Sequence, residues 1–291
     1  MTVDSLLIER GAVVLGAKGM LGRGLCALLE ERGVSVIAAD REVFDVADPE
    51  GVKRSRLPMD AVWFNCAAWT DVDGAEAHEA DALAVNGGEG LQAICDRLRD
   101  ADGKLVHVST DYVFDGRASE PYRVDEPRDP IGAYGRTKAA GEKVIEDSGC
   151  AFIIARTSWI YAPWANNFVR TMAKLTRDRD ELKVVDDQRG RPTSAEHLAR
   201  SLVALVDAEG TGTFHVTDGG ECTWYEFACA IRDGLGHACE IKPCTTDEFP
   251  RPAPRPAYSV LDLSRTEALI GRMPEWRANL ADVLKRLEPL G

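Results

Sequence analysis

The stretch AVVLGAKGMLGRGLCALLEERGVSVIAAD, residues 12–40, decides the fold. Its apolar start, Ala12–Leu15, predicts a short buried strand, and a glycine-rich turn then leads into an amphipathic helix that ends near Arg32. Residues 34–38 predict a second strand, which leads to Asp40. This order of strand, turn, helix and strand predicts one unit of a parallel α/β sheet.

The glycines of the turn, Gly16, Gly19 and Gly22, follow the spacing GxxGxxG. Together with Met20 and Leu21 they would let a pyrophosphate approach the backbone, because free N–H groups and the helix dipole favour anions at a helix N-terminus. A glycine triplet also occurs in ordinary turns. The strand before it, the helix after it and the acid that ends the second strand nevertheless favour a dinucleotide site.

Two neighbouring residues at the end of the second strand predict opposite cofactors. Asp40 would accept a hydrogen bond from a ribose 2′-hydroxyl and favours NADH, whereas Arg41 would meet a 2′-phosphate and favours NADPH. The sequence therefore leaves NADH or NADPH open. Phe44, Asp45 and Val46 would flank the adenine, although an ordinary loop explains them equally well.

Further apolar runs alternate with helical segments along the first half of the chain. Strands are predicted at residues 61–65, 104–108 and 152–155, and a helix at 73–100 with a break near Asn86. This alternation predicts an α/β fold, a doubly wound parallel sheet of the Rossmann type, and ligands bind at the carboxyl ends of its strands. Small residues follow the strand that ends at residue 65, and the candidate cofactor-binding residues there are Cys66, Ala67 and Ala68.

The segment VSTDYVFDGRASEPYRVDEPRDPIGAYGRTK, residues 108–138, carries a candidate proton-donating site. Its helix holds Tyr134 and Lys138 four residues apart, so both lie on one face. The charge of Lys138 would favour the tyrosinate and lower the pKa of Tyr134 toward neutrality, with a hydroxyl of Ser109 or Thr110 facing the pair. An ordinary exposed pair has the same spacing, but the converging strand ends favour a catalytic site.

Beyond residue 158 the alternation becomes looser, with a smaller C-terminal part. Helices are predicted at residues 166–177, 194–206 (capped by Ser194), 224–235 and 276–287, and strands at 182–185 and 212–216. Residues 1–158 are therefore assigned to a dinucleotide-binding domain, onto which 194–217 packs back, and 159–291 mainly to a substrate-binding part.

The proline-rich segment FPRPAPRP, residues 249–256, excludes a helix or a central strand. Its prolines fix two arginines, Arg251 and Arg255. A rigid surface crossing and a clamp for an anionic substrate both explain this pattern.

Composition limits the class of protein. The chain has 291 residues, 45% of them hydrophobic, and a net charge of −13. A globular protein is expected, and the negative charge argues against nucleic acid and anionic membrane as partners. No apolar run is long enough to span a bilayer, and the N-terminus lacks the features of a secretory signal. The eight cysteines form no CxxC pair and the five histidines stand alone, which predicts reduced cysteines, a cytoplasmic protein and no zinc site.

The chain resembles the extended short-chain dehydrogenase/reductases, and within them the dTDP-4-dehydrorhamnose reductase family. The resemblance covers most of the chain, and the motifs that carry it are GAKGMLG (16–22), NCAAWTDVDGAE (65–76), VNGG (85–88), VSTDYVFDG (108–116), YGRTKAAGE (134–142), RTSWIY (156–161), NFVRTM (167–172), DQRGRPT (187–193) and RPAPRP (251–256). It implies hydride transfer from NADPH or NADH to the C4 ketone of a dTDP-linked 4-keto-6-deoxy sugar. The reaction it favours most is the reduction of dTDP-4-dehydro-L-rhamnose to dTDP-L-rhamnose.

The resemblance also implies roles for particular residues. Thr110, Tyr134 and Lys138 match the catalytic set: Tyr134 would protonate the carbonyl oxygen, Thr110 would donate a hydrogen bond to it, and Lys138 would hold the nicotinamide ribose. Tyr112 replaces the second acid of the related 4,6-dehydratases, so elimination of water is not expected. Asn86 joins the cofactor-binding residues, and the implied substrate-binding residues are Thr70, Asp71, Ser109, Asp111, Tyr112, Trp159, Asn167, Phe168, Arg251 and Arg255.

Gly24 stands where magnesium-using members carry a carboxylate at a dimer-interface metal site, so no metal is predicted and a homodimer stays open. A sister dTDP-sugar 4-ketoreductase, for example of a dihydrostreptose pathway, is the first alternative. A non-catalytic regulatory subunit of the methionine adenosyltransferase type is the second, and the intact catalytic set argues against it.

Overall fold

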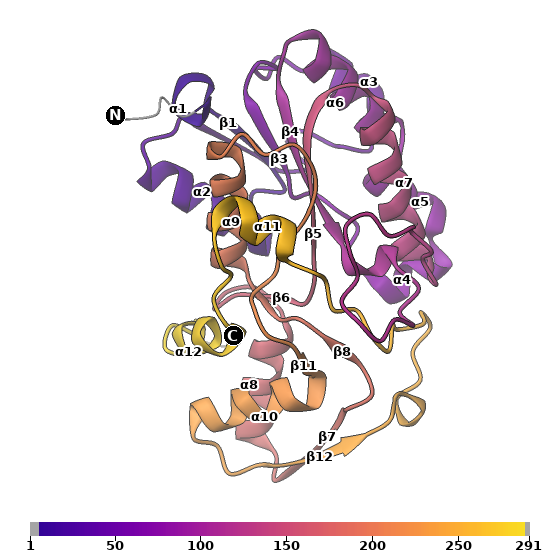
Figure 1. The fold of residues 1–291 in the computed structure, drawn as a ribbon, viewed down its shortest axis with the longest axis vertical. Helices are drawn as coiled ribbons and strands as arrows, with labels where there is room; N and C mark the ends of the chain where they lie inside the picture. The colour runs from indigo at the N-terminus through magenta and orange to yellow at the C-terminus, as the bar shows by residue number, and fades with distance from the viewer. Residues whose placement is uncertain (1–5, 289–291) are drawn as a thin grey trace.

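The computed structural model describes residues 6–288 and is built around a six-stranded parallel sheet (Figure 1). The strand order is β10-β5-β4-β3-β1-β2, and every neighbouring pair is parallel. The strands are β1 (Ala12–Leu15), β2 (Val36–Ala39), β3 (Val62–Asn65), β4 (Lys104–Thr110), β5 (Ala151–Thr157) and β10 (Gly212–His215). The predicted doubly wound parallel sheet is thus confirmed.

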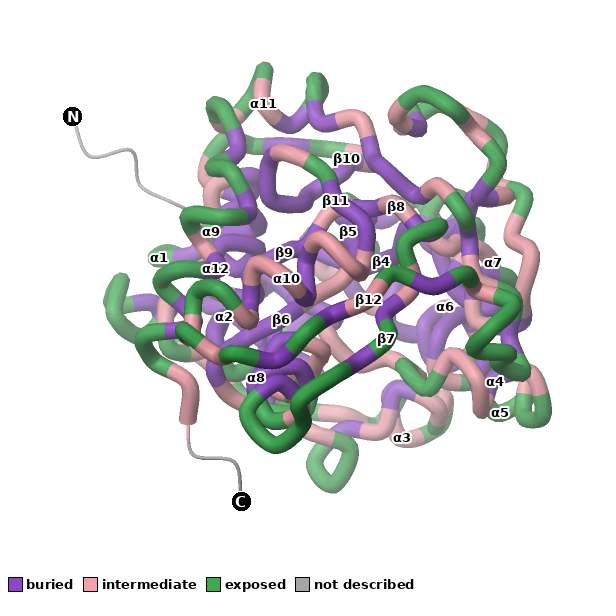
Figure 2. Tube along the Cα trace, turned by 90° about the horizontal axis from the view of Figure 1, so that it is seen from below, coloured by how far each residue is buried: buried purple, intermediate pink, exposed green. Residues whose placement is uncertain are grey.

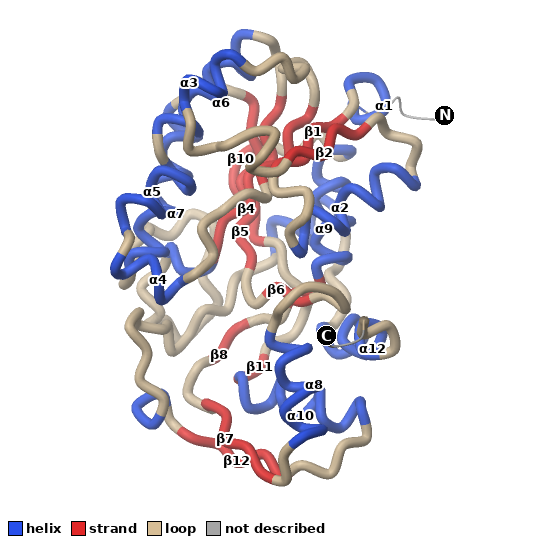
Figure 3. Tube along the Cα trace, turned by 180° about the vertical axis from the view of Figure 1, so that it is seen from behind, coloured by secondary structure: helices blue, strands red, loops and turns tan. Residues whose placement is uncertain are grey.

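Helices cover both faces of the sheet (Figure 3). Val14 of β1 packs with Leu25 and Leu198 on one face, whereas its neighbour Val13 packs with Leu98 on the other. Burial on both faces explains why the strands read as continuous apolar runs. The covering helices are α1 (Leu6–Arg10), α2 (Met20–Glu31) and α9 (Ala195–Asp207) on the first face, and α3 (Pro49–Arg54), α4 (Val72–Ala77), α5 (Glu79–Gly87), α6 (Glu89–Asp100) and α7 (Ala133–Asp147) on the second.

The remaining elements form a smaller part at the carboxyl ends of the strands (Figure 1). Its core gathers around Phe227, which is fully buried. Its larger elements are the parallel pair β7 (Glu181–Val185) and β12 (Glu240–Cys244), with α8 (Phe168–Asp178), α10 (Trp224–Leu235) and α12 (Trp276–Leu284). The shorter elements are β6 (Ile160–Tyr161), β8 (Arg189–Gly190), β9 (Thr193–Ser194), β11 (Cys222–Thr223) and the 3₁₀ turns η1 (Asp111–Val113) and η2 (Thr246–Glu248). Helix α11 (Ser264–Ile270) packs against α9 and β10.

Several local predictions need correction. The helical segment expected at 73–100 breaks at Gly88, close to the expected position, and it also leaves helical geometry at His78, so it is three helices. Ser194 precedes α9, but its hydroxyl makes no capping hydrogen bond; its N–H donates instead to Asp218 Oδ2 at 3.1 Å. The sequence patterns also missed β12, α3 and α11.

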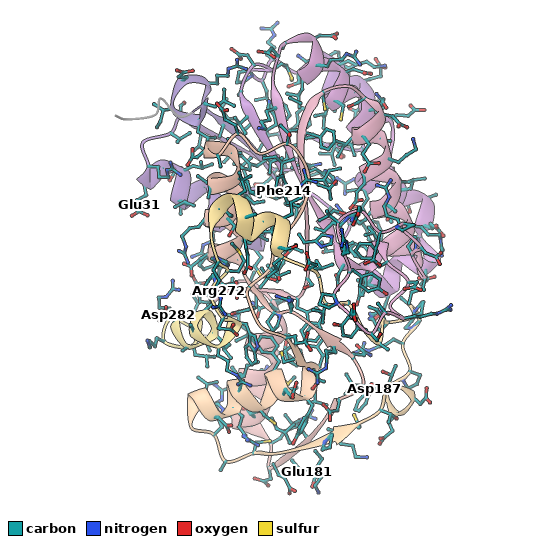
Figure 4. All side chains as sticks on the ribbon, viewed as in Figure 1. Glu31, Glu181, Asp187, Phe214, Arg272 and Asp282 are labelled. Carbon is teal, nitrogen blue, oxygen red and sulfur yellow. The ribbon has the colours of Figure 1, made fainter. Side chains whose placement is uncertain are left out.

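Buried residues follow the sheet and the cores beside it, and exposed ones follow the outer loops and helices (Figure 2). The acidic side chains of Glu31, Glu181 and Asp282 point outward from both parts of the molecule (Figure 4). Within residues 6–288, no helix has the length and apolar character that a bilayer crossing requires.

Candidate active site

A cavity of about 790 Å³ lies at the carboxyl ends of β1, β3 and β4. Trp159 and Trp224 bring the smaller part of the molecule to its wall. The sequence-predicted residues that line it are Gly16, Gly19, Met20, Leu21, Asp40, Arg41, Asp45, Val46, Cys66, Ala67, Ala68, Thr70, Ser109, Thr110, Asp111, Tyr112, Tyr134, Lys138 and Trp159. The strand ends therefore converge on one site, as the sheet topology requires.

The glycine-rich turn fits a dinucleotide pyrophosphate. Gly16 has a φ of +69°, and a Cβ there would lie 2.9 Å from the backbone nitrogen of Ala67. A Cβ at Gly22 would lie 2.2 Å from the carbonyl oxygen of Gly16, so no larger residue fits this contact. Helix α2 starts after Gly19 without a side-chain cap, which leaves its first N–H groups available to an anion.

Cationic side chains flank Asp40 at the adenosine end of the cavity. Asp40 Oδ1 accepts a hydrogen bond of 2.9 Å from the N–H of Lys18, and the Lys18 ammonium lies 3.5 Å from its Oδ2. Arg41 donates to Asp45 Oδ2 at 3.1 Å, and its side chain is 85% exposed. Both residues therefore have partners: Asp40 is bound by Lys18, and Arg41 by Asp45, although the Arg41 side chain is far more exposed.

Tyr134, Lys138 and Glu142 follow one another at four-residue spacing on the face of α7 that meets β4. Lys138 is buried, and its Nζ donates to the Val108 carbonyl oxygen at 2.7 Å. It also lies 3.2 Å from Nε2 of His107. Burial lowers the pKa of Lys138 to about 8, so its charged and neutral forms are close in free energy near neutral pH.

Tyr134 is a phenol that stays protonated. Burial raises its pKa to about 12, the Asp111 carboxylate raises it further, and a hydrogen bond with Thr110 acts in the opposite direction. The expectation that Lys138 lowers this pKa toward neutrality is therefore wrong, because the cost of burying the phenolate is the largest influence on it. A protonated phenol is the form that a proton donor requires.

Asp111 orients the hydroxyl of Thr110. Thr110 Oγ1 donates to Asp111 Oδ1 at 2.9 Å and accepts from the N–H of Tyr112 at 3.2 Å. The other carboxyl oxygen of Asp111 has no hydrogen-bond partner among the described residues, and burial raises the pKa of Asp111 to about 6.

Two indole rings form the wall on the side of the smaller part. Trp159 adopts a φ of +48°, a conformation that costs energy for a residue with a side chain. Its ring stacks on Trp224, with 3.6 Å between ring centroids and 14° between the planes. Gly190 makes room for this stack, since a Cβ there would lie 2.8 Å from the ring of Trp159. Such a wall suits a sugar or a base.

Several predicted residues lie outside the cavity lining and stabilise the loops around it. Asp71 caps α4, Asn86 Oδ1 accepts from the N–H of Trp69 at 2.9 Å, and Asn167 caps α8. The binding roles of this group stay predictions, and its members are Gly22, Asp71, Asn86, Asn167, Phe168, Arg251 and Arg255.

The proline-rich segment is tied to the dinucleotide-binding part by one carboxylate. Arg255 donates to Asp73 Oδ1 at 3.0 Å, and the N–H of Ala253 donates to the same oxygen at 3.2 Å. Arg251 lies 3.8 Å from Asp73 Oδ2. Both arginines therefore pair with a carboxylate of the protein itself. This agrees with a rigid surface crossing, and the role of the segment as a clamp for an anionic substrate stays a prediction.

Residues beyond the named candidates complete the cavity. Phe44 was expected at the adenine, and Trp224 begins the helix with an aromatic start. Others lie within the motifs that carry the resemblance: Trp69, Val72, Val85, Val108, Thr157, Ser158 and Ile160. Ala165 and Asn166 gave no signal. Among residues 6–288, no group of three His, Cys, Asp or Glu side chains is placed to hold a metal ion, and Gly24 packs against the ring of Trp164.

Comparisons with known proteins identify the family of the chain. The model of the RmlD substrate binding domain family matches residues 10–288. The dTDP-4-dehydrorhamnose reductase of Streptomyces griseus is 42% identical over 282 residues, which cover 93% of this chain and 91% of that protein. The dTDP-4-keto-6-deoxy-D-glucose reductase of Streptomyces niveus is 44% identical over 259 residues, or 86% of this chain and 87% of that protein. A crystal structure of dTDP-4-dehydrorhamnose reductase from Bacillus anthracis in complex with NADP matches with a TM-score of 0.90 at 32% identity, covering 94% of this chain and 98% of that one.

The fold and the site define an NAD(P)-dependent oxidoreductase of the extended short-chain dehydrogenase/reductase type. Within that class the chain belongs to the RmlD substrate binding domain family, whose members are dTDP-4-keto-sugar reductases related to dTDP-4-dehydrorhamnose reductase.

Proposed function

We propose that this enzyme reduces the C4 ketone of a dTDP-linked 4-keto-6-deoxyhexose, and that its substrate is dTDP-4-dehydro-L-rhamnose, giving dTDP-L-rhamnose. The observation that carries the proposal is the meeting of Thr110, Tyr134 and Lys138 with the glycine-rich turn in one cavity. The 42% identity to the Streptomyces griseus reductase supports the choice of sugar.

The side chains divide the chemistry among them. Bound NADPH or NADH supplies the hydride to the carbonyl carbon. Tyr134, protonated because its pKa is about 12, gives its proton to the carbonyl oxygen, so that an alcohol forms. Thr110 would turn its hydroxyl from Asp111 Oδ1 to the same oxygen, and Lys138, held by the Val108 carbonyl oxygen, would bind the ribose. General acid help of this kind is typically worth about 10²- to 10⁴-fold in rate.

We further propose NADPH as the better cofactor. Arg41 pairs with Asp45 at 3.1 Å, but its side chain is 85% exposed, so a 2′-phosphate can compete with this carboxylate for the guanidinium. The NADP complex of the Bacillus anthracis relative supports the same choice. Within this proposal residues 1–158, joined by 194–217, hold the dinucleotide and residues 159–291 mainly hold the sugar nucleotide.

A sister dTDP-sugar 4-ketoreductase is the second candidate. The 44% identity to the Streptomyces niveus enzyme, whose name gives a different sugar, favours it specifically.

The test supplies dTDP-4-keto-6-deoxyglucose with and without a 3,5-epimerase, follows oxidation of NADPH and of NADH, and identifies the product by NMR. Product only with the epimerase, with the configuration of L-rhamnose, is expected. Product without the epimerase supports the sister reductase. No oxidation with either sugar contradicts the proposal and favours a binding protein, such as a regulatory subunit.

A further inference from the structure

A second cavity, of about 500 Å³, lies between α11, residues 219–220 and the segment that follows β8. The described residues that line it are all different from those that line the candidate active site. Arg191 lines this second cavity, and its carbonyl oxygen accepts a hydrogen bond of 2.7 Å from Ser158, which lines the first. The two cavities are therefore separate, and Arg191 lies at the boundary between them.

Arg191 is a cation without a partner. In the described part of the chain its side chain makes no hydrogen bond and no ion pair, and its Nε is buried. Burial lowers the pKa of Arg191, and acidic side chains nearby, first among them Glu221, act in the opposite direction without touching it. A guanidinium nevertheless stays charged in proteins, and a charge that is withdrawn from water without a partner is costly. The cavity beside Arg191 therefore favours an anion.

Two carboxylates of the same cavity limit what else the ligand can carry. Asp262 Oδ1 accepts from the N–H of Ser264 at 3.2 Å, and Glu267 Oε1 accepts from the N–H of Met273 at 3.1 Å. The second oxygen of each carboxylate has no hydrogen-bond partner among the described residues. An ionised carboxylate can only accept, so these oxygens suit hydroxyl groups and repel a second anion. The cavity thus fits a ligand with one anionic group and several hydroxyls.

We propose that this cavity binds a hexose phosphate, with the phosphate on Arg191 and sugar hydroxyls on Asp262 and Glu267. A guanidinium matches phosphate oxygens with two parallel hydrogen bonds. The cavity volume lies within the range of about 300–1,000 Å³ that is typical of small-molecule sites. No aromatic residue lines it in the part of the chain that the structure describes, so a nucleotide base would have no ring to stack on. The site does not depend on the proposed reductase reaction.

Calorimetric titration of the full-length protein with NADPH present measures the binding of α-D-glucose 1-phosphate, glucose and inorganic phosphate. Arg191→Gln removes the unpaired charge. Arg189→Gln is the matched control, because Arg189 lies two residues away, pairs with Glu221 at 3.5 Å and does not line the cavity. We expect glucose 1-phosphate to bind the wild type once per chain and more tightly than phosphate or glucose. Arg191→Gln should weaken it at least about tenfold, because a charge-assisted hydrogen bond is lost, and Arg189→Gln should leave it nearly unchanged.

Thermal unfolding is the second measurement. Without ligand, Arg191→Gln should raise the unfolding midpoint, because it removes a charge that has no partner. Glucose 1-phosphate should raise the midpoint of the wild type and not that of the variant. A lower midpoint in the ligand-free variant would mean that Arg191 already has a stabilising partner, and would count against the site.

Three results of the titration would overturn the site: no binding, binding that Arg191→Gln leaves unchanged, and equal losses in the two variants. Equal affinities for inorganic phosphate and glucose 1-phosphate would overturn the assignment to a sugar phosphate. None of these measurements uses reductase activity, so failure of the proposed reaction is a separate result.

Discussion

Ser109 donates a hydrogen bond of 2.6 Å to Oε1 of Glu142, a carboxylate without solvent exposure. The same carboxylate receives Arg156 through two hydrogen bonds, of 2.9 and 2.7 Å, and Arg128 through one of 2.9 Å. The strand end that carries Thr110 and the helix that carries the proposed acid are thus tied together by one buried anion. The Ser109 hydroxyl donates to a carboxylate that two arginines also hold, whereas the Thr110 hydroxyl donates to Asp111, which itself lines the cavity.

We predict that Glu142→Gln lowers the free energy of unfolding by about 3–5 kcal/mol, because it leaves the buried guanidinium of Arg156 without its counter-charge. Urea unfolding of the purified variant measures this loss. Glu146→Gln is the matched control, since Glu146 pairs with Arg128 at the surface and its removal should cost only about 0–1 kcal/mol. Equal losses in the two variants would show that burial of the Glu142 pair is not what matters.

Removal of the phenol hydroxyl should slow the chemical step without changing cofactor binding or the fold. Tyr134→Phe keeps the ring, its edge-to-face contact with Tyr112 and the fold, so we expect kcat to fall by at least about 10²-fold with nearly unchanged NADPH affinity. Steady-state rates and a direct binding titration measure the two quantities. Near-normal turnover would remove Tyr134 from the role of acid.

Two substitutions at the adenosine end should act in opposite directions. Asp40→Ala removes the carboxylate that would meet a 2′-hydroxyl and should weaken NADH more than NADPH. Arg41→Ala should weaken NADPH more than NADH, and Lys18→Ala, which removes the second cation beside Asp40, should do the same to a smaller extent. The dissociation constants of NADH and NADPH are measured for each variant. If Asp40→Ala weakens the binding of both cofactors equally, Asp40 does not contact the ribose 2′-hydroxyl.

The sheet and the convergence of its strand ends followed from local patterns. Apolar runs such as Ala12–Leu15 and the glycine spacing after them depend on neighbours in sequence, and parallel pairing then brings strand ends together. The spacing of Tyr134 and Lys138 likewise placed both on one helix face. What sequence spacing could not provide was solvent exclusion, and burial is why the pKa of Tyr134 rises where a fall was expected.

Contacts between segments far apart in sequence could not be predicted either, because they leave no pattern in the local sequence. Asp73 lies 182 residues from Arg255 in sequence, and the sequence around either residue does not indicate that the two form an ion pair. Trp224 gave only a weak aromatic signal, because its place in the cavity depends on a stack with Trp159 that forms across two parts of the fold. Loops positioned by tertiary packing carry little pattern of their own.

The raised pKa of Asp111 makes a prediction about stability. Its folded-state pKa of about 6 lies above its ordinary value of 3.8, so folding favours the protonated form. This contribution to stability is complete below about pH 3.8 and is lost as the pH rises through about 6. Asp111→Asn mimics the protonated form and keeps an acceptor for Thr110, so it should gain roughly 2–3 kcal/mol over the wild type above pH 6.

Urea unfolding at about pH 4 and about pH 7.5 measures this gain, which should be present only at the higher pH. Asp115→Asn is the control with the opposite sign, because a hydrogen bond from Tyr122 lowers the pKa of Asp115 and its charged form is the favoured one. That variant should lose stability at the higher pH. A loss in Asp111→Asn as well would mean that the carboxylate form of Asp111 is stabilised in the fold, and the cost of desolvation assigned to it would have to be abandoned.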